Sequence, residues 1–269
     1  HLDHRDSHQM IMIGYSDSNK DGGLAAARWT LHNAQRDLVD AVEKFDVKLT
    51  LFHGRGGTVS RGGGRLHEAI FAAPSGVVTG RLRMTEQGEM INAKYGLHTI
   101  ALRSLEQTVS SVLAVTVKPH EHPKAASSWR KIMSEIATAS RAAYGGMIYD
   151  RSEFPAYFRD ATPIDVIERL GIGSRPTSRG DLGSLEELRA IPWVFAWTQS
   201  RLILPGWFGL GTGLEHALAK FGEETLRDMQ AEWYFFRVLL SDVEVVLGKV
   251  DLEIAELYSK LAGPLHDMF

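Results

Sequence analysis

The sequence predicts an α/β fold that is predominantly helical and contains about four parallel strands and long C-terminal helices. Short apolar runs are each followed by a polar or glycine-rich loop and then by a helical pattern. This alternation is typical of parallel strands, which are buried on both faces. The 269 residues are 44 % hydrophobic and 23 % charged, an ordinary globular composition. Because no repeat or linker divides the chain, we expect residues 1–269 to form a single domain.

The first strand is predicted to end in a turn that carries a lysine and two carboxylates. Met10–Gly14 is the apolar strand, and residues 15–23 form the polar turn. A carboxylate at a strand end suits Mg²⁺, so Asp17 is a candidate metal ligand, and Lys20 could face an anion. The turn could equally cap the helix that three-to-four apolar spacing predicts over residues 24–45. The residues alone leave both interpretations open.

The second strand leads to the stretch around which the chain is organised. Val47–Phe52 runs into His53 and then into residues 54–64, here called the glycine loop, which hold six glycines together with Arg55 and Arg61. Glycines let backbone N–H groups approach a ligand, and arginines supply forked donors for phosphate or carboxylate. An anion site is favoured over a plain flexible loop. An RNA-binding tract ranks third, because the formal charge of −3 does not favour nucleic acid.

Two further strands complete the predicted sheet. A short helix over residues 66–73 precedes Val77–Met84, which has strand character and leads to Glu86. Glu86 could line a site, although capping of the next helix, expected within residues 90–117, is the better explanation. Ile191–Thr198 is the fourth strand-like run. Since the carboxyl ends of parallel strands meet at one edge, the polar loops that follow them should lie on the same side.

The remaining segments are predicted to be helical or irregular. A helix begins at Ser128, residues 150–158 look irregular, and a short helix begins at Thr162 and Pro163. An apolar, glycine-broken connection over residues 201–213 leads into a helical pattern that continues to Leu261.

A second glycine- and arginine-rich loop lies over residues 171–183 and contains Arg175. The run Ser184–Glu187 fits a capping box, which would put Arg189 at the end of a brief helix. Lys249 lies late in the C-terminal helical pattern, and its local sequence assigns it no more than a solvated surface position.

Composition also excludes some classes of protein. The chain has no cysteine, which rules out disulfides and thiolate metal sites and fits a cytoplasmic protein. There is no run of 18 or more apolar residues, so no membrane span is expected.

Three motifs together point to one family. Met12–Gly23, Phe52–Gly64 and Thr85–Gly96, in this order and spacing, closely resemble phosphoenolpyruvate carboxylase. The resemblance runs from about Gln9 to the end of the chain and also includes Tyr157–Pro163, Gly173–Pro176 and Leu188–Gln199. These motifs are long and specific, unlike a lone glycine fingerprint.

The resemblance implies a fold and a reaction. The family is built round an eight-stranded α/β barrel and is usually a homotetramer, so the chain resembles part of a TIM-type barrel, truncated at both ends. The implied reaction is Mg²⁺- or Mn²⁺-dependent carboxylation of phosphoenolpyruvate by bicarbonate, which gives oxaloacetate and phosphate. All reactants are anions, which suits clustered arginines and a metal ion. The alternative is an inactive fragment or an anion-binding scaffold without turnover.

The resemblance also implies roles for individual residues. Asp17 matches the metal-binding aspartate, and aspartate or malate is the expected feedback inhibitor. The implied catalytic residues are Lys20, His53, Arg55 and Arg61; the implied substrate-binding residues are Arg55, Arg175 and Arg189; the implied inhibitor-binding residues are Arg61 and Lys249. Arg65 departs from the family pattern, in which proline is expected after the glycines. Other catalytic groups of the family are expected upstream of His1, so we predict that this chain alone is inactive or nearly so.

Overall fold

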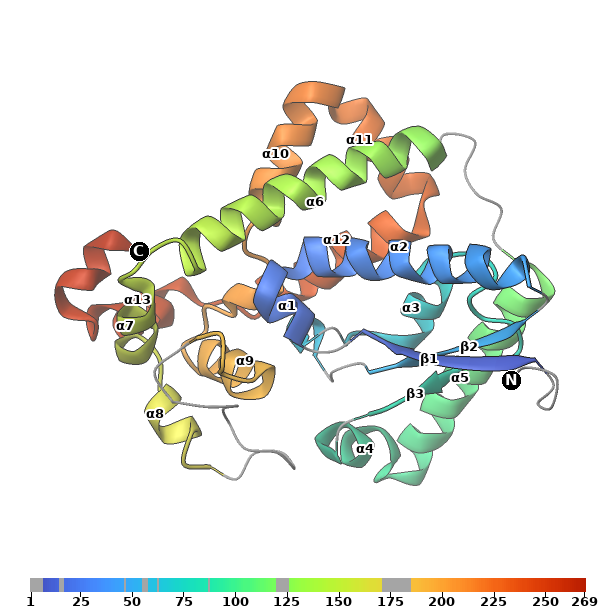
Figure 1. The fold of residues 1–269 in the computed structure, drawn as a ribbon. Helices are drawn as coiled ribbons and strands as arrows, with labels where there is room; N and C mark the ends of the chain where they lie inside the picture. Colours follow the sequence, from blue (N-terminus) through green and yellow to red (C-terminus); the bar gives the residue numbers. More distant parts are fainter. Residues whose placement is uncertain are drawn as a thin grey trace.

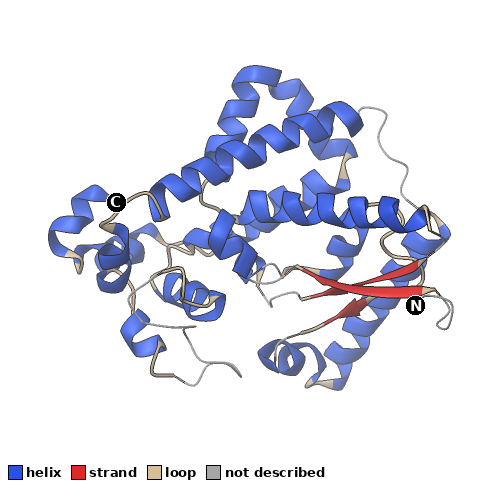
Figure 2. Ribbon diagram, viewed as in Figure 1, coloured by secondary structure: helices blue, strands red, loops and turns tan. Residues whose placement is uncertain are grey.

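The structure, a computed structural model, describes residues 7–14, 17–45, 47–54, 58–61, 63–86, 88–119, 126–170 and 185–269. The side chains of Arg61, Glu89 and Ala126 are also outside the description. Helices make up most of the described chain, and the strands gather at one end of it (Figure 2). The prediction of a predominantly helical α/β fold is therefore confirmed.

The described strands form one parallel sheet in the order β1–β2–β3. These strands are β1 (His8–Ile13), β2 (Lys48–His53) and β3 (Arg83–Met84). Ile13 is paired with His53, and His53 is paired with Met84, so the three strands end level with one another. The predicted alignment of their carboxyl ends is thus confirmed, and the loops that follow leave the sheet from one edge.

Two of the four predicted strands need correction. Within Val77–Met84 only Arg83 and Met84 pair with β2, because Gly80 turns the chain with φ +74° and the valines at 77 and 78 are buried in the core instead. Ile191–Thr198 lies inside helix α9 (Ala190–Gln199) and is not a strand. Helix α9 is buried on nearly all sides, so its sequence lacks the polar face that would have identified it as a helix. The TIM-type barrel stays a prediction.

The helices follow the predicted order, with bounds that differ in places. They are α1 (Asp17–Gly22), α2 (Leu24–Glu43), α3 (Leu66–Ala72), α4 (Gly88–Tyr95), α5 (His98–Val117), α6 (Ala126–Ile148), α7 (Phe154–Asp160), α8 (Ile164–Ile167), α10 (Leu210–Phe221), α11 (Glu223–Glu232), α12 (Tyr234–Leu247) and α13 (Leu252–Lys260). Short 3₁₀ helices are η1 (Val59–Arg61), η2 (Leu204–Gly206) and η3 (Gly263–Met268).

Three segments predicted as turn or irregular structure are partly helical. The polar turn after β1 contains α1. Residues 150–158, expected to be irregular, contain most of α7, whose Phe154, Tyr157 and Phe158 are all buried. Helix α10 begins at Leu210, inside the predicted connection. In each case tertiary burial overrides a weak local pattern.

Three apolar clusters hold these elements together. One joins α2, α6, α10 and α12, a second joins α7 to α9, and a third surrounds β2 with α2 and α3. The sheet therefore lies at one end of the molecule, and α7, α8, α9 and α13 lie at the other (Figure 1). None of the described helices combines the length and the apolar character needed to cross a membrane.

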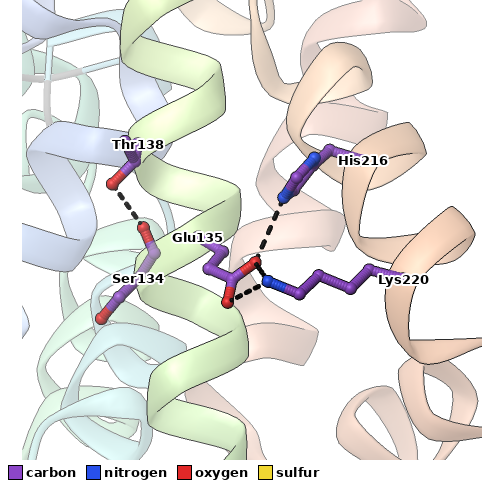
Figure 3. A network of polar contacts seen from close by, with 5 residues as sticks. All are labelled: Ser134, Glu135, Thr138, His216 and Lys220. Carbon is purple, nitrogen blue, oxygen red and sulfur yellow. Dashed lines mark hydrogen bonds and ion pairs between the residues drawn. The ribbon is translucent and has the colours of Figure 1, made fainter.

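Helices α6 and α10 pack closely and are also bridged by charge. A methyl group on Gly213 would overlap Ser140 Oγ, which explains why glycine stands at this contact. At the surface, Glu135 of α6 accepts hydrogen bonds from Lys220 Nζ at 2.8 and 2.9 Å and contacts His216 Nε2 at 3.2 Å (Figure 3). The bonds from Lys220 and then His216 hold the pKa of Glu135 below its ordinary value.

Candidate active site

The aligned strand ends bring the polar loops together. Gly54 N donates to Ile13 O at 2.9 Å, and Thr85 N donates to His53 O at 2.9 Å, so the ladder continues just past each strand. Gly14 has φ +74° and turns the chain away from the sheet toward α1. Asp17, at the first position of α1, therefore lies near the carboxyl edge of the sheet.

Asp17 and Arg189 are brought together by one backbone contact. Asp17 Oδ1 accepts a hydrogen bond from Ala190 N at 3.2 Å, across 173 positions of sequence. Ala190 is the first residue of α9, and Arg189 is its N-cap. Arg189 thus precedes a helix rather than ending one, which corrects the prediction. A carboxylate at a helix N-terminus is stabilised by the helix dipole, so this contact sets the predicted metal ligand beside a predicted substrate-binding arginine.

Arg189 has a buried donor without a hydrogen bond to the described residues. Its Nε is buried and makes no hydrogen bond to the residues that the structure describes. Buried donors in proteins are nearly always paired, with protein, water or ligand. A guanidinium N–H is a strong, charge-assisted donor to carboxylate or phosphate oxygens.

Lys20 is buried beside the same edge, with 3 % of its surface exposed. Its Nζ contacts Asp21 Oδ1 at 3.3 Å, and Tyr149 Oη donates to its backbone carbonyl at 3.0 Å. Burial, followed by the nearby Asp21 carboxylate, raises the pKa of Tyr149 and keeps it a neutral donor. No described side chain of the polar turn caps α2, whose N-cap is Gly23, the last residue of the turn, which makes no side-chain cap bond.

His53 lines a small pocket, largely apolar, at the end of β2. The pocket has a volume of about 70 Å³, and Arg28, His32 and Asp242 line it together with apolar side chains. His53 is 9 % exposed and ends β2.

A larger, open cleft of about 640 Å³ shares Asp242 and Leu66 with this pocket. Thr58, Ser60 and Gly64 of the glycine loop line it, together with Lys249, which follows α12. The structure thus brings the loop that carries Arg61 and the predicted inhibitor lysine to one cavity. The backbone of Arg61 belongs to η1.

Two basic residues of this cleft were not predicted as site residues. Arg65 lines the cleft and contacts Glu68 Oε1 at 2.7 Å, and Lys94 lines it from α4 and contacts Glu86 Oε1 at 2.7 Å. Lys94 lies inside the third motif of the resemblance, so the motif was the available signal. Among the described residues, the cleft therefore contains three cationic side chains, of which Arg65 and Lys94 are paired with carboxylates.

Other predicted site residues lie outside the described residues. These are Arg55 and Arg175, together with the whole second glycine- and arginine-rich loop. Their roles stay predictions.

Among the described residues at the strand ends, Asp17 is a suitable ligand for a metal ion. Among the described residues no group of three or more histidine, aspartate or glutamate side chains is arranged to hold a metal ion. Mg²⁺, however, commonly binds through only one or two carboxylates, with water and substrate oxygens completing its shell. The hard carboxylate of Asp17 fits that mode of binding.

Comparison with known proteins gives the same family throughout. A model of the family described as phosphoenolpyruvate carboxylase matches residues 1–268. The chain is 52 % identical over 270 residues to the phosphoenolpyruvate carboxylase of Xanthomonas campestris pv. campestris (strain 8004), covering all of this chain and 30 % of that protein. It is 46 % identical over 257 residues to that of Shewanella sediminis (strain HAW-EB3), covering 96 % and 29 %. It is also 46 % identical over 253 residues to phosphoenolpyruvate carboxylase 4 of Arabidopsis thaliana, covering 94 % and 24 %.

The chain spans about 30 % of the length of the curated relatives it matches first. The match to the family covers nearly every residue, including all three motifs at the strand ends. The chain belongs to the phosphoenolpyruvate carboxylase family.

Proposed function

We propose that this chain is a catalytic part of a phosphoenolpyruvate carboxylase, a carboxy-lyase that joins phosphoenolpyruvate and bicarbonate to give oxaloacetate and phosphate. The observation that carries the proposal is the contact between Asp17 Oδ1 and Ala190 N, which unites a predicted metal ligand and a predicted substrate-binding arginine. Family membership supports the same reaction for the whole protein.

The reaction needs stabilisation of negative charge more than it needs a nucleophile from the protein. A bicarbonate oxygen attacks the phosphorus atom, and the enolate of pyruvate leaves, so that carboxyphosphate forms. Carboxyphosphate releases carbon dioxide and phosphate, and the enolate carbon then forms the new bond to carbon dioxide. Each species is anionic or develops negative charge, and fixed guanidinium groups in a site of low water content stabilise such charge well.

The residues of this chain divide that work. Arg189 offers its buried Nε to a carboxylate or phosphoryl oxygen, and we assign Arg55 and Arg175 to the same anions. Lys20 adds positive charge at the edge where Asp17 lies. Asp17 would hold Mg²⁺ or Mn²⁺, which supplies Lewis-acid polarisation of the reacting oxygens. We assign His53, the last residue of β2, to the same reaction.

The open cleft suits a dicarboxylate. Lys249 and Arg65 line it with the glycine loop, and two separated cations match the two carboxylates of aspartate or malate. We propose that the cleft is the feedback-inhibitor site, with Arg61 as a further ligand. The rest of the proposed protein follows its family: a TIM-type barrel, a single catalytic domain, a homotetramer and a cytoplasmic enzyme that feeds the tricarboxylic acid cycle.

We also propose an alternative function, because the chain spans only about 30 % of the length of its relatives. A chain of this extent could bind phosphoenolpyruvate without turning it over. We expect no steady formation of oxaloacetate by the purified chain, and steady formation would contradict that expectation.

Calorimetric titration with phosphoenolpyruvate in the presence of Mg²⁺ tests the site. Arg189→Ala should weaken binding roughly tenfold or more, because it removes a charge-assisted donor. Arg227→Ala is the matched control: Arg227 is an exposed arginine of α11 that pairs with Glu223 at 2.6 Å. Equal affinity of the wild-type chain and Arg189→Ala would overturn the assignment.

A further inference from the structure

A buried ion pair joins helices that are far apart in sequence. Arg28 of α2 and Asp242 of α12 are 214 positions apart, and Arg28 Nη2 lies 2.9 Å from Asp242 Oδ2. Their side chains are only 14 % and 8 % exposed. Burial lowers the pKa of Arg28, and the carboxylate of Asp242 opposes that shift. Because desolvation offsets much of the attraction in a buried pair, stability alone does not explain its presence.

The same arginine atom also holds the glycine loop. Arg28 Nη2 donates to the carbonyl of Gly63 at 2.6 Å. Gly63 N in turn donates to Thr58 O at 2.7 Å, so the loop closes on itself just where Arg28 binds it. This part of the loop is therefore tied both to its own first turn and to helix α2.

Asp242 contacts the next residue of the loop. A Cβ atom added to Gly64 would lie 3.0 Å from Asp242 Oδ1 and 3.2 Å from Oδ2, and Gly64 has φ +108°. Only glycine combines that backbone conformation with so close an approach to a carboxylate. Both members of the ion pair thus pack directly against the backbone of the loop.

The pair also adjoins both cavities. Arg28 and Asp242 line the small pocket that contains His53, and Asp242 lines the open cleft as well. Lys249 of that cleft follows Asp242 by seven positions, about two helical turns. The position of the pair therefore fixes the loop relative to both His53 and Lys249.

We propose that Arg28 and Asp242 are positioning residues that set the glycine loop for anion binding. They hold the loop through the carbonyl of Gly63 and the close contact at Gly64, and they do not touch the substrate. The effect of this anchoring on substrate binding rests on the proposed function. Its structural part, the anchoring of the loop, stands on the contacts of Arg28 and Asp242 alone.

The test replaces the pair as a unit. Single variants would leave a buried charge without its partner and could fail to fold. Apolar replacement of both members of a buried pair, in contrast, often leaves the stability of a protein unchanged or raises it. Arg28→Met combined with Asp242→Leu should leave the denaturation midpoint near that of the wild-type chain. Exchange of the Gly63 amide hydrogen should nevertheless become about tenfold faster or more, because the loop loses its charged donor. The affinity for phosphoenolpyruvate should fall roughly tenfold.

Two control variants show whether a change in Gly63 exchange or in affinity comes from loss of the Arg28–Asp242 pair. Arg227→Ala, which breaks an exposed pair on α11, should leave both Gly63 exchange and affinity unchanged. Arg28→Lys keeps a cationic donor toward Asp242 and should restore part of the Gly63 protection that the double variant loses.

The outcomes distinguish the two proposals. If the wild-type chain does not bind phosphoenolpyruvate, the proposed function fails for this chain, while faster Gly63 exchange in the double variant still supports the anchor. If the double variant is folded and keeps wild-type exchange at Gly63, the anchor is refuted, whatever the affinity. If exchange quickens but affinity is unchanged, the loop is anchored without effect on binding, and the positioning role is refuted.

Discussion

Replacement of Gly64 by alanine tests how tightly the glycine loop is packed. Gly64 has φ +108°, a sparsely populated conformation that costs an alanine about 1–3 kcal/mol. Its new methyl would also lie 3.0 Å from a carboxylate oxygen of Asp242, which is held in place by Arg28. Displacing such a packed group costs about 1–3 kcal/mol. Alanine also restricts the unfolded chain, which stabilises the fold by about 0.4–1 kcal/mol. The net decrease in the free energy of unfolding is therefore about 3 kcal/mol.

The assay is urea denaturation of Gly64→Ala beside Gly80→Ala. Gly80 has φ +74°, and among the described residues its Cβ would contact only the Thr116 methyl, at 4.0 Å. Gly80→Ala therefore carries the backbone cost alone, about 1 kcal/mol after the same correction. We expect Gly64→Ala to be clearly the less stable variant. Equal losses in the two variants would refute the steric role of Asp242.

Three further predictions concern the helices. Glu135→Gln should lower the denaturation midpoint near pH 7. The pKa of Glu135 is lowered in the folded chain, so the stability that its charge contributes is present above its ordinary pKa and is lost as the pH falls through the folded value. A difference in midpoint between the variant and the wild type that persisted in acid would contradict this. Leu105→Glu with Leu113→Glu should reduce self-association measured by light scattering, because these leucines are 51 % and 60 % exposed on α5, and unchanged scattering would contradict it. Gly213→Ala should cost about 1–3 kcal/mol in urea denaturation through overlap with α6, and a neutral effect would count against the close packing of α6 and α10.

The part of the fold that follows local patterns was predictable. Val47–Phe52 is a short, largely apolar run and residues 24–43 have a clear amphipathic period, so β2 and α2 were both anticipated. Helix α9 was not, because Trp193, Ala196 and Trp197 are each about 1 % exposed or less and the segment has no polar face. Its Pro192 stands in the first helical turn, where a missing N–H breaks no helical hydrogen bond.

The site was predictable from motifs but not from spacing. The approach of Asp17 to the start of α9 spans 173 positions, and no periodicity reports a contact of that range. Family resemblance named both Asp17 and Arg189, and the structure then placed them together. The pair of Arg28 and Asp242 had no signal of either kind, since a charged residue on a helix is ordinarily solvated. Lys249 was named only by the resemblance, and the structure shows which residues line the cleft beside it.

The central claim is that Asp17 and the arginine side chains form one metal-assisted anion site. The most direct measurement is the affinity for phosphoenolpyruvate with and without Mg²⁺, by calorimetry, in the wild-type chain and in Asp17→Asn. Asparagine keeps the oxygen that accepts from Ala190 N, so α9 stays capped while the metal-binding charge is lost. We predict that Mg²⁺ strengthens binding to the wild-type chain and has no effect on the variant. The same Mg²⁺ dependence in both, or none in either, would contradict the account.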